Sequence, residues 1–131
     1  MGVMDGLEVV YVEQLVGPRT LRIFRETGHR LPAHATSAGK VLLAHLSQVL
    51  AERLLDWRPV LTPHTVTDEA TLLAQLRRVK ARGWAQNLEE AIPGVPSVAA
   101  PVRADTGTVV AAISVVGHIT RRRFRGIGRR S

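Results

Sequence analysis

Length, composition and charge restrict this protein to a few classes. Its 131 residues are enough for one domain with a hydrophobic core, and a hydrophobic content of 45% is typical of globular proteins. No apolar run is long enough to cross a bilayer and no signal peptide is visible, so we predict a cytoplasmic protein without membrane contact. The chain has no cysteine, which excludes disulfides and cysteine-ligated metals.

The positive charge is concentrated at the C-terminal end. The formal net charge of +7 by itself favours a nucleic-acid partner. Six of the 18 basic residues lie within residues 121–131, however, which leaves 12 basic against 11 acidic residues before them. We therefore predict a nearly neutral domain over residues 1–118 and a disordered basic tail over 119–131. Nucleic-acid binding through this tail is an alternative function.

The N-terminal part favours strands. Residues 7–16 are rich in β-branched side chains and have turn residues on both sides, which predicts a strand. Apolar and polar residues alternate over 21–25, which predicts the second strand of an antiparallel hairpin. Pro32 then blocks a continuing helix or a central strand.

The middle of the chain favours helices. Apolar residues recur at helical spacing from about Thr36, and a short second helix is expected over 47–55. The clearest helix is 68–82, with Thr67 as its N-cap and Gly83 at its end.

Three strands are expected after these helices, over 84–88, 98–103 and 108–116, with a tight turn between the last two. The run VVAAISVV is apolar at every position except Ser114, so we expect this strand to be central and covered on both faces. The sum is an α+β fold, an antiparallel sheet with helices packed on it.

Catalytic and metal-binding signatures are not visible in the sequence. It has no nucleophile elbow, zinc-protease, P-loop or Rossmann pattern, and its histidines are not spaced as a metal pair. His45 is interpreted as a partly buried structural residue. The carboxylates of Glu89 and Glu90 would point to opposite faces of an extended segment, so we expect capping or turn-forming roles rather than catalysis.

Two segments are candidates for ligand binding. Small side chains over 34–40 leave backbone amides uncovered at a helix N-terminus, where they could hold a carboxylate or phosphate. The alternative is that Gly39 only permits close helix packing. The constrained loop 91–96 either lines a site or is a rigid connection between strands.

Five segments, taken together, match one family pattern. Residues 28–44 fit G-x-x-L-P-x-H-A-T-x-x-G-K-x-x-L-A. The others follow in the same order: 65–68 with the next helix and 82–85, then 88–90 with Gly94, then 98–102, and finally 109–117. Over about residues 5–118 the chain resembles the C-terminal effector-binding domain of IclR-type bacterial transcription regulators.

This resemblance implies a GAF-like fold with a pocket on one side of the sheet. The pocket would bind a small effector, a carboxylate or an aromatic metabolite, without enzymatic turnover and without a cofactor or metal. Binding would shift the arrangement of subunits in a homo-oligomer, a dimer or tetramer, and so control transcription. A small enzyme acting through the regions around Glu89 and His34 is a further alternative.

The resemblance also assigns pocket residues. The polar part consists of helix-start residues and short side chains on strands: Ser37, Ala38, Asn87, Ser97 and Ser114. The apolar wall would consist of Leu21, Ile23, Leu31 and Val95. Some relatives have an acid in place of Asn87 and a serine in place of Val116, which allows a more apolar ligand here.

Parts of the family pattern are not found in this sequence. The winged helix-turn-helix, through which such regulators contact DNA, and the linker helix are not in the chain. We also expect the opening helix and strand of the domain to be missing, and the closing helices to be replaced by the arginine tail. Apolar surface would then be left uncovered, which predicts association with a second copy or another chain.

Overall fold

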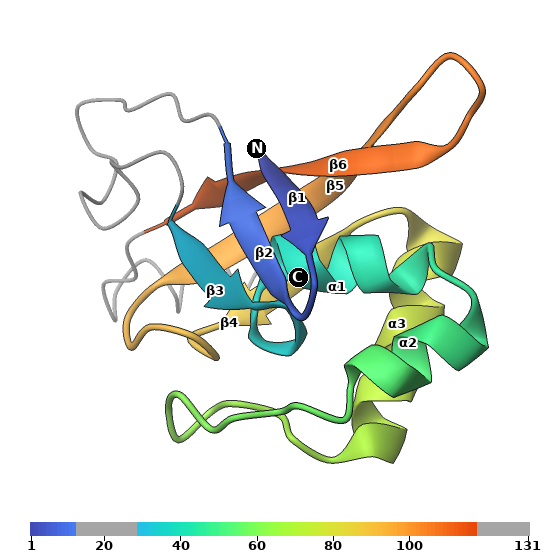
Figure 1. Ribbon diagram of the computed structural model, residues 1–131. Helices are drawn as coiled ribbons and strands as arrows, with labels where there is room; N and C mark the ends of the chain where they lie inside the picture. The colour runs from blue at the N-terminus through green and yellow to red at the C-terminus, as the bar shows by residue number, and fades with distance from the viewer. Residues whose placement is uncertain (13–28, 118–131) are drawn as a thin grey trace.

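A computed structural model describes residues 1–12 and 29–117. Within these two ranges, six antiparallel strands form one sheet in the order β3-β2-β1-β6-β5-β4, and three α-helices accompany it (Figure 1). The strands are β1 (Gly2–Asp5), β2 (Glu8–Tyr11), β3 (Arg30–Pro32), β4 (Ala85–Leu88), β5 (Pro96–Arg103) and β6 (Val109–Val116). The helices are α1 (Ser37–Ala44), α2 (Gln48–Leu54) and α3 (Glu69–Arg82), with a 3₁₀ turn η2 (Ala33–Ala35) before α1. The α+β fold is as predicted.

The N-terminal hairpin differs from the prediction. Strand β2 ends at Tyr11, whereas the predicted strand 7–16 continues into residues that the structure does not describe, and residues Gly2–Asp5 form a strand, β1, that was not predicted. The two strands pair through Val3 and Val10, and Gly6 turns between them with φ of +62°. The residues Asp5-Gly6 therefore mark a turn inside the first hairpin rather than the start of the sheet. The predicted strand over 21–25 and the predicted tail lie outside the described residues.

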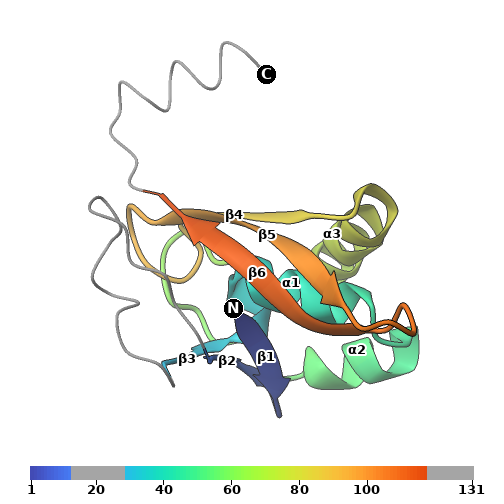
Figure 2. The same ribbon diagram turned by 90° about the horizontal axis from the view of Figure 1, so that it is seen from above.

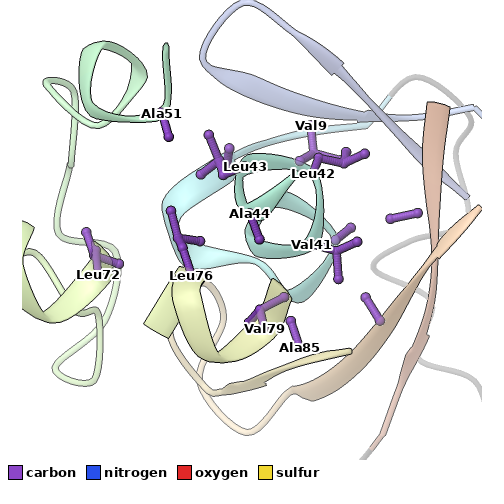
Figure 3. Close-up of a cluster of buried hydrophobic side chains, with 14 of the residues drawn as sticks. Val9, Val41, Leu42, Leu43, Ala44, Ala51, Leu72, Leu76, Val79 and Ala85 are labelled. Atoms are coloured by element: carbon purple, nitrogen blue, oxygen red, sulfur yellow. The ribbon is translucent and has the colours of Figure 1, made fainter. Parts of the chain in front are cut away.

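Small residues on the inner face of the sheet let α1 lie close to it. The β4–β5–β6 register places Ala85 beside Ala99, and Ala99 beside Ser114, while Gly2 of β1 pairs with Ala112 of β6. Apart from Ser114, these residues are alanine or glycine, and their small side chains leave room for a helix. Helix α1 packs against the sheet at this point. Figure 3 shows Val41 and Leu42 pointing from α1 toward the strands.

A second layer of helix covers the other side of α1. Leu76 and Val79 of α3 are buried and point toward α1 (Figure 3). The hydrophobic core is therefore one cluster that extends from the sheet through α1 to α3. Burial of these apolar side chains is the main favourable contribution to folding.

The helix ends follow from their capping residues. The Thr36 hydroxyl accepts a hydrogen bond from the Gly39 amide at 2.9 Å and caps α1, and Ser47 caps α2 as predicted. At α3 the cap is Asp68, whose carboxylate accepts from the Thr71 amide, rather than the predicted Thr67. Gly83 ends α3 with φ of +88°, as expected for a left-handed C-terminal residue.

The outer face of the sheet corrects one prediction. Strand β6 is central, between β1 and β5, but within the described residues only its inner face is covered. Val98, Ile113 and Val115 are 51%, 56% and 74% exposed on the outer face. In Figure 2, α1 lies behind β5 and β6, on the inner side of the sheet. The apolar run over β6 therefore indicates a strand with an exposed apolar face.

Candidate functional site

A hollow opens on the inner face of the sheet, beside the start of α1. It encloses about 290 Å³ including its open mouth. Among the described residues it is lined from seven parts of the fold: β2, β3, the N-cap of α1, β4, the loop before β5, β5 and β6. The lining residues are Tyr11, Leu31, Thr36, Asn87, Ala91, Ile92, Val95, Ser97, Ser114 and Val116.

The position of the hollow follows from strand register and from where α1 begins. Ser97 of β5 pairs with Asn87 of β4 on one side and with Val116 of β6 on the other, so the three residues form one row across the sheet. The next row, which includes Ala99, is covered by α1. Because α1 begins at Ser37, beside Ser97, the helix leaves part of the row at Ser97 open, together with Ser114 of the next row, and these residues form the floor of the hollow.

Hydrogen bonds hold the polar side chains of the hollow in place. The hydroxyls of Ser37 and Ser97 are 2.7 Å apart, which joins the first residue of α1 to β5. Asn87 donates to the Ala35 carbonyl at 2.8 Å and accepts from the Glu90 amide at 2.8 Å. Asn87 therefore fixes both the entry to α1 and the turn after β4, with one amide hydrogen left for a ligand.

Tyr11 supplies a polar atom beside apolar surface. Burial raises the pKa of Tyr11 to about 12, against a smaller lowering by its side-chain hydrogen bond with Thr36. The phenol is consequently neutral at physiological pH and acts as a hydrogen-bonding group, not as a base.

The hollow contains most, but not all, of the residues predicted for the pocket. Asn87, Ser97 and Ser114 line it, together with Leu31 and Val95. Ser37 lies behind Ser97, and Ala38 is fully buried next to β1, so neither lines the hollow in this structure. Leu21 and Ile23 lie outside the described residues.

Sequence reasoning missed several lining residues. Tyr11 and Thr36 contribute polar atoms to the lining. Ala91 and Ile92 belong to the constrained loop 91–96, for which the sequence allows either a ligand site or a rigid connection between strands. Alternation in β2 could have identified Tyr11, because it shares the inner face with Val9. The 91–96 loop does line the hollow, through its first two residues and Val95.

The hollow is electrically neutral but polarised. No charged side chain is found among its described lining residues. Thr36 lies at the N-terminus of α1, where the first backbone amides make no bond within the helix and the helix dipole favours negative charge. Leu31, Ile92 and Val95 provide apolar surface. This arrangement suits a small molecule with an apolar body and an anionic or polar end.

The other candidate residues have structural contacts. Glu89 adopts φ of +62° and accepts from the Gly94 amide at 2.6 Å, whereas Glu90 is buried in an ion pair with Lys40. Glu89 thus has a turn-forming contact, as expected, but the segment is not extended at residue 89, and Glu90 forms a buried ion pair rather than a cap or turn contact. His45 is partly buried and bonds the Val41 carbonyl through Nδ1. Within the ranges 1–12 and 29–117, no three His, Cys, Asp or Glu residues are grouped to hold a metal.

The fold and the hollow define a small-molecule-binding α+β domain, and comparison with known proteins identifies its class. The family model described as "Bacterial transcriptional regulator IclR C-terminal" matches residues 1–129. The chain belongs to the IclR family of bacterial transcriptional regulators, and it has the fold of their C-terminal effector-binding domain. No helix within the described residues has the length and apolar character needed to span a membrane.

Curated relatives are transcription regulators. The HTH-type transcriptional regulator XynR of Escherichia coli is 36% identical over 117 residues, covering 88% of this chain and 46% of the relative. The Pca operon regulatory protein of Acinetobacter baylyi is 36% identical over 124 residues, covering 87% of this chain and 43% of the relative. The chain therefore spans less than half the length of these relatives.

Solved structures include complexes of such domains. The PobR inducer-binding domain of Acinetobacter, a double mutant in complex with 3-hydroxybenzoic acid, is 36% identical with a TM-score of 0.83; the match covers 92% of this chain and 71% of that one. An IclR homologue of Microbacterium hydrocarbonoxydans in complex with 4-hydroxybenzoate is 29% identical with a TM-score of 0.82, over 98% and 55%.

Proposed function

We propose that this domain senses a small aromatic carboxylate in the hollow beside α1. The observation that carries the proposal is the lining itself, which combines short hydroxyl groups, a helix N-terminus and an apolar wall. Two structural relatives have hydroxybenzoates bound, and this supports an aromatic acid as the ligand class.

The chemistry of the lining gives the ligand an orientation. Its carboxylate would lie toward Ser97 and Ser114, whose hydroxyl groups line the hollow beside the start of α1, because the hydroxyl of Thr36 already donates to the Ala33 carbonyl. Its ring would pack against Ile92, Val95 and Val116. A neutral site of this kind holds a carboxylate through hydrogen bonds rather than an ion pair, so we expect moderate affinity, as a reversible sensor needs.

Binding would act by selecting one arrangement of subunits in a homo-oligomer. A ligand shifts such an equilibrium only by its difference in affinity for the two arrangements. DNA would be contacted by a winged helix-turn-helix in the bacterial cytoplasm, and this chain would supply the sensing part. No turnover is proposed, because the hydroxyls of the hollow have no histidine beside them among its described lining residues.

The test is thermal unfolding of the purified chain with a small panel of compounds. The panel contains 3-hydroxybenzoate, 4-hydroxybenzoate and benzoate, with benzyl alcohol to remove the carboxylate and succinate to remove the ring. We expect a concentration-dependent rise in Tm with the aromatic acids and a smaller one, or none, with the other two.

Ser114→Leu locates the binding site. The added side chain would fill the hollow and abolish the rise in Tm. The matched control is Val115→Leu, the next residue of β6, which lies on the outer face and should leave the rise intact. A rise that survives Ser114→Leu, or no rise with any aromatic acid, would contradict the proposal.

A further inference from the structure

A second cavity lies between α1, α3 and β4. It encloses about 380 Å³ including its mouth, and it shares no described lining residue with the hollow at Ser97. Its lining residues come from one helix turn of α1, one side of α3 and the first half of β4: Lys40, Gln75, Arg78, Val79, Arg82 and Gln86. Three of these six residues are cationic, two are amides and none is acidic.

The cationic character follows from helical spacing in α3. Gln75, Arg78 and Arg82 are separated by three and four residues, so they lie along one side of the helix. Lys40 approaches the same space from α1 and forms its buried part, since it is only 2% exposed. Lys40 is neutralised by its ion pair with Glu90, whereas Arg78 and Arg82 have no ion-pair partner within the described residues, so the net charge of the cavity comes from the two arginines.

Lys40 has hydrogen-bonding capacity left for a ligand. Its ammonium donates to the Glu90 carboxylate at 2.5 Å and to the Gln75 side-chain carbonyl at 2.8 Å. An ammonium group has three N–H donors. The third has no partner within the described part of the chain, although the residue is almost fully buried.

The two arginines are also available. The Arg82 guanidinium stacks on the Trp84 ring at 3.7 Å, and its Nε donates to the Trp84 carbonyl at 2.9 Å. Its position is therefore fixed while its two terminal nitrogens remain for an anion. Arg78 has no ion-pair partner among residues 1–12 and 29–117.

We propose that this cavity binds a phosphate-type oxyanion, free or as the phosphate group of a small metabolite. Planar guanidinium groups bind the oxygens of phosphate in pairs, and a lysine adds a point charge. Val79 is the one apolar side chain among the described lining residues, so the cavity does not suit the aromatic acid proposed for the hollow. The two sites would thus take different ligands.

The experiment measures inorganic phosphate binding by isothermal titration calorimetry in phosphate-free buffer, with ionic strength held constant by chloride. Arg78→Gln removes one cation from the cavity. The matched control is Arg77→Gln, which makes the same charge change on the neighbouring residue of α3, outside the lining. We expect the Kd for phosphate to rise about tenfold in Arg78→Gln, as for the loss of one charged hydrogen bond, and to stay nearly unchanged in Arg77→Gln.

The same titrations can overturn the proposal. Equal weakening in both variants would show general charge attraction instead of a site. Phosphate binding that Arg78→Gln leaves unchanged would place it elsewhere on the chain, and no binding by the wild-type chain at millimolar phosphate would exclude the site. These outcomes are independent of the benzoate experiment, because neither arginine lines the hollow.

Discussion

The ion pair between Lys40 and Glu90 joins α1 to the segment that follows β4. Both side chains are buried, and the other Glu90 oxygen accepts from the Val66 amide at 3.2 Å. Glu90 also donates its own amide to Asn87, a lining residue of the hollow. A buried charge is tolerated only when such partners are present, so the pair depends on both of its members.

Lys40→Met tests this dependence. The change leaves the Glu90 carboxylate buried without its cation, so we expect the free energy of unfolding to fall by about 3 kcal/mol. Urea denaturation measures the loss. Lys80→Met, on the exposed side of α3, should change stability by less than about 0.5 kcal/mol. The double change Lys40→Met with Glu90→Leu should recover much of the lost stability. If it does not, the loss in Lys40→Met comes from altered packing rather than from the unpaired charge of Glu90.

His34 predicts a pH dependence of stability. Burial lowers the pKa of His34 below its usual 6.5, more than its bond to the Pro59 carbonyl raises it. The unfolded chain then takes up a proton at His34 more readily than the folded one, so the free energy of unfolding falls as pH drops below 6.5. Denaturant melts between pH 7.5 and pH 5 should show a flatter profile for His34→Gln, whereas His64→Gln, at an exposed residue, should follow the wild type.

The lining of the hollow shows what residue patterns can and cannot predict. Strand alternation sends Ser97 and Ser114 to the inner face, where both line the hollow, and their role in effector binding stays a prediction. Ser37 and Ala38 were expected to line the same site, but Ser37 contacts Ser97 of β5, Ala38 lies against β1, and both are buried. The orientation of a helix on the sheet decides which of its first residues face a cavity. The sequence of the helix alone does not determine this orientation.

At the scale of elements, α1 depends on the absence of a side chain at Gly39. A Cβ at this position would lie 2.1 Å from the Ala33 carbonyl oxygen, in the backbone of η2. We expect Gly39→Ala to force the helix from η2 and lower the free energy of unfolding by about 2 kcal/mol. Chemical denaturation measures it, with Gly117→Ala as the control, where the added Cβ would meet only ordinary contacts. An unchanged stability for Gly39→Ala would show that η2 moves without cost.

The helices were easier to predict than the strands. Capping residues and apolar spacing located α1, α2 and α3 to within two residues, since helix signals are local. Strand β1 was missed because GVMD is four residues long and lacks alternation, and it is a strand through its pairing with β2 and β6. Pairing between distant segments is not visible in a short run of sequence. The resemblance to the IclR pattern supplied the fold where local signals did not.

At the scale of the whole molecule, α1 lies between the two proposed sites. Its N-cap residue Thr36 lines the hollow, and Lys40 lines the cavity beside α3. Asn87, Glu90 and Lys40 connect the two through successive hydrogen bonds. The two proposed sites are therefore contiguous through α1 and the segment that follows β4.

The outer face of the sheet predicts self-association of the chain. Val98, Ile113 and Val115 form an exposed apolar surface over β5 and β6, and such surfaces on folded domains mark interfaces. We expect sedimentation velocity to show a concentration-dependent dimer or larger species for the wild-type chain. Ile113→Lys or Val115→Lys, which places a charge in that surface, should shift it to monomer while leaving the inner-face core intact. Val60→Lys, at an equally exposed residue in the loop after α2, should associate like the wild type. A wild-type chain that remains monomeric at the highest concentration, or a Val60→Lys variant that dissociates as well, would show that this face does not hold two copies together.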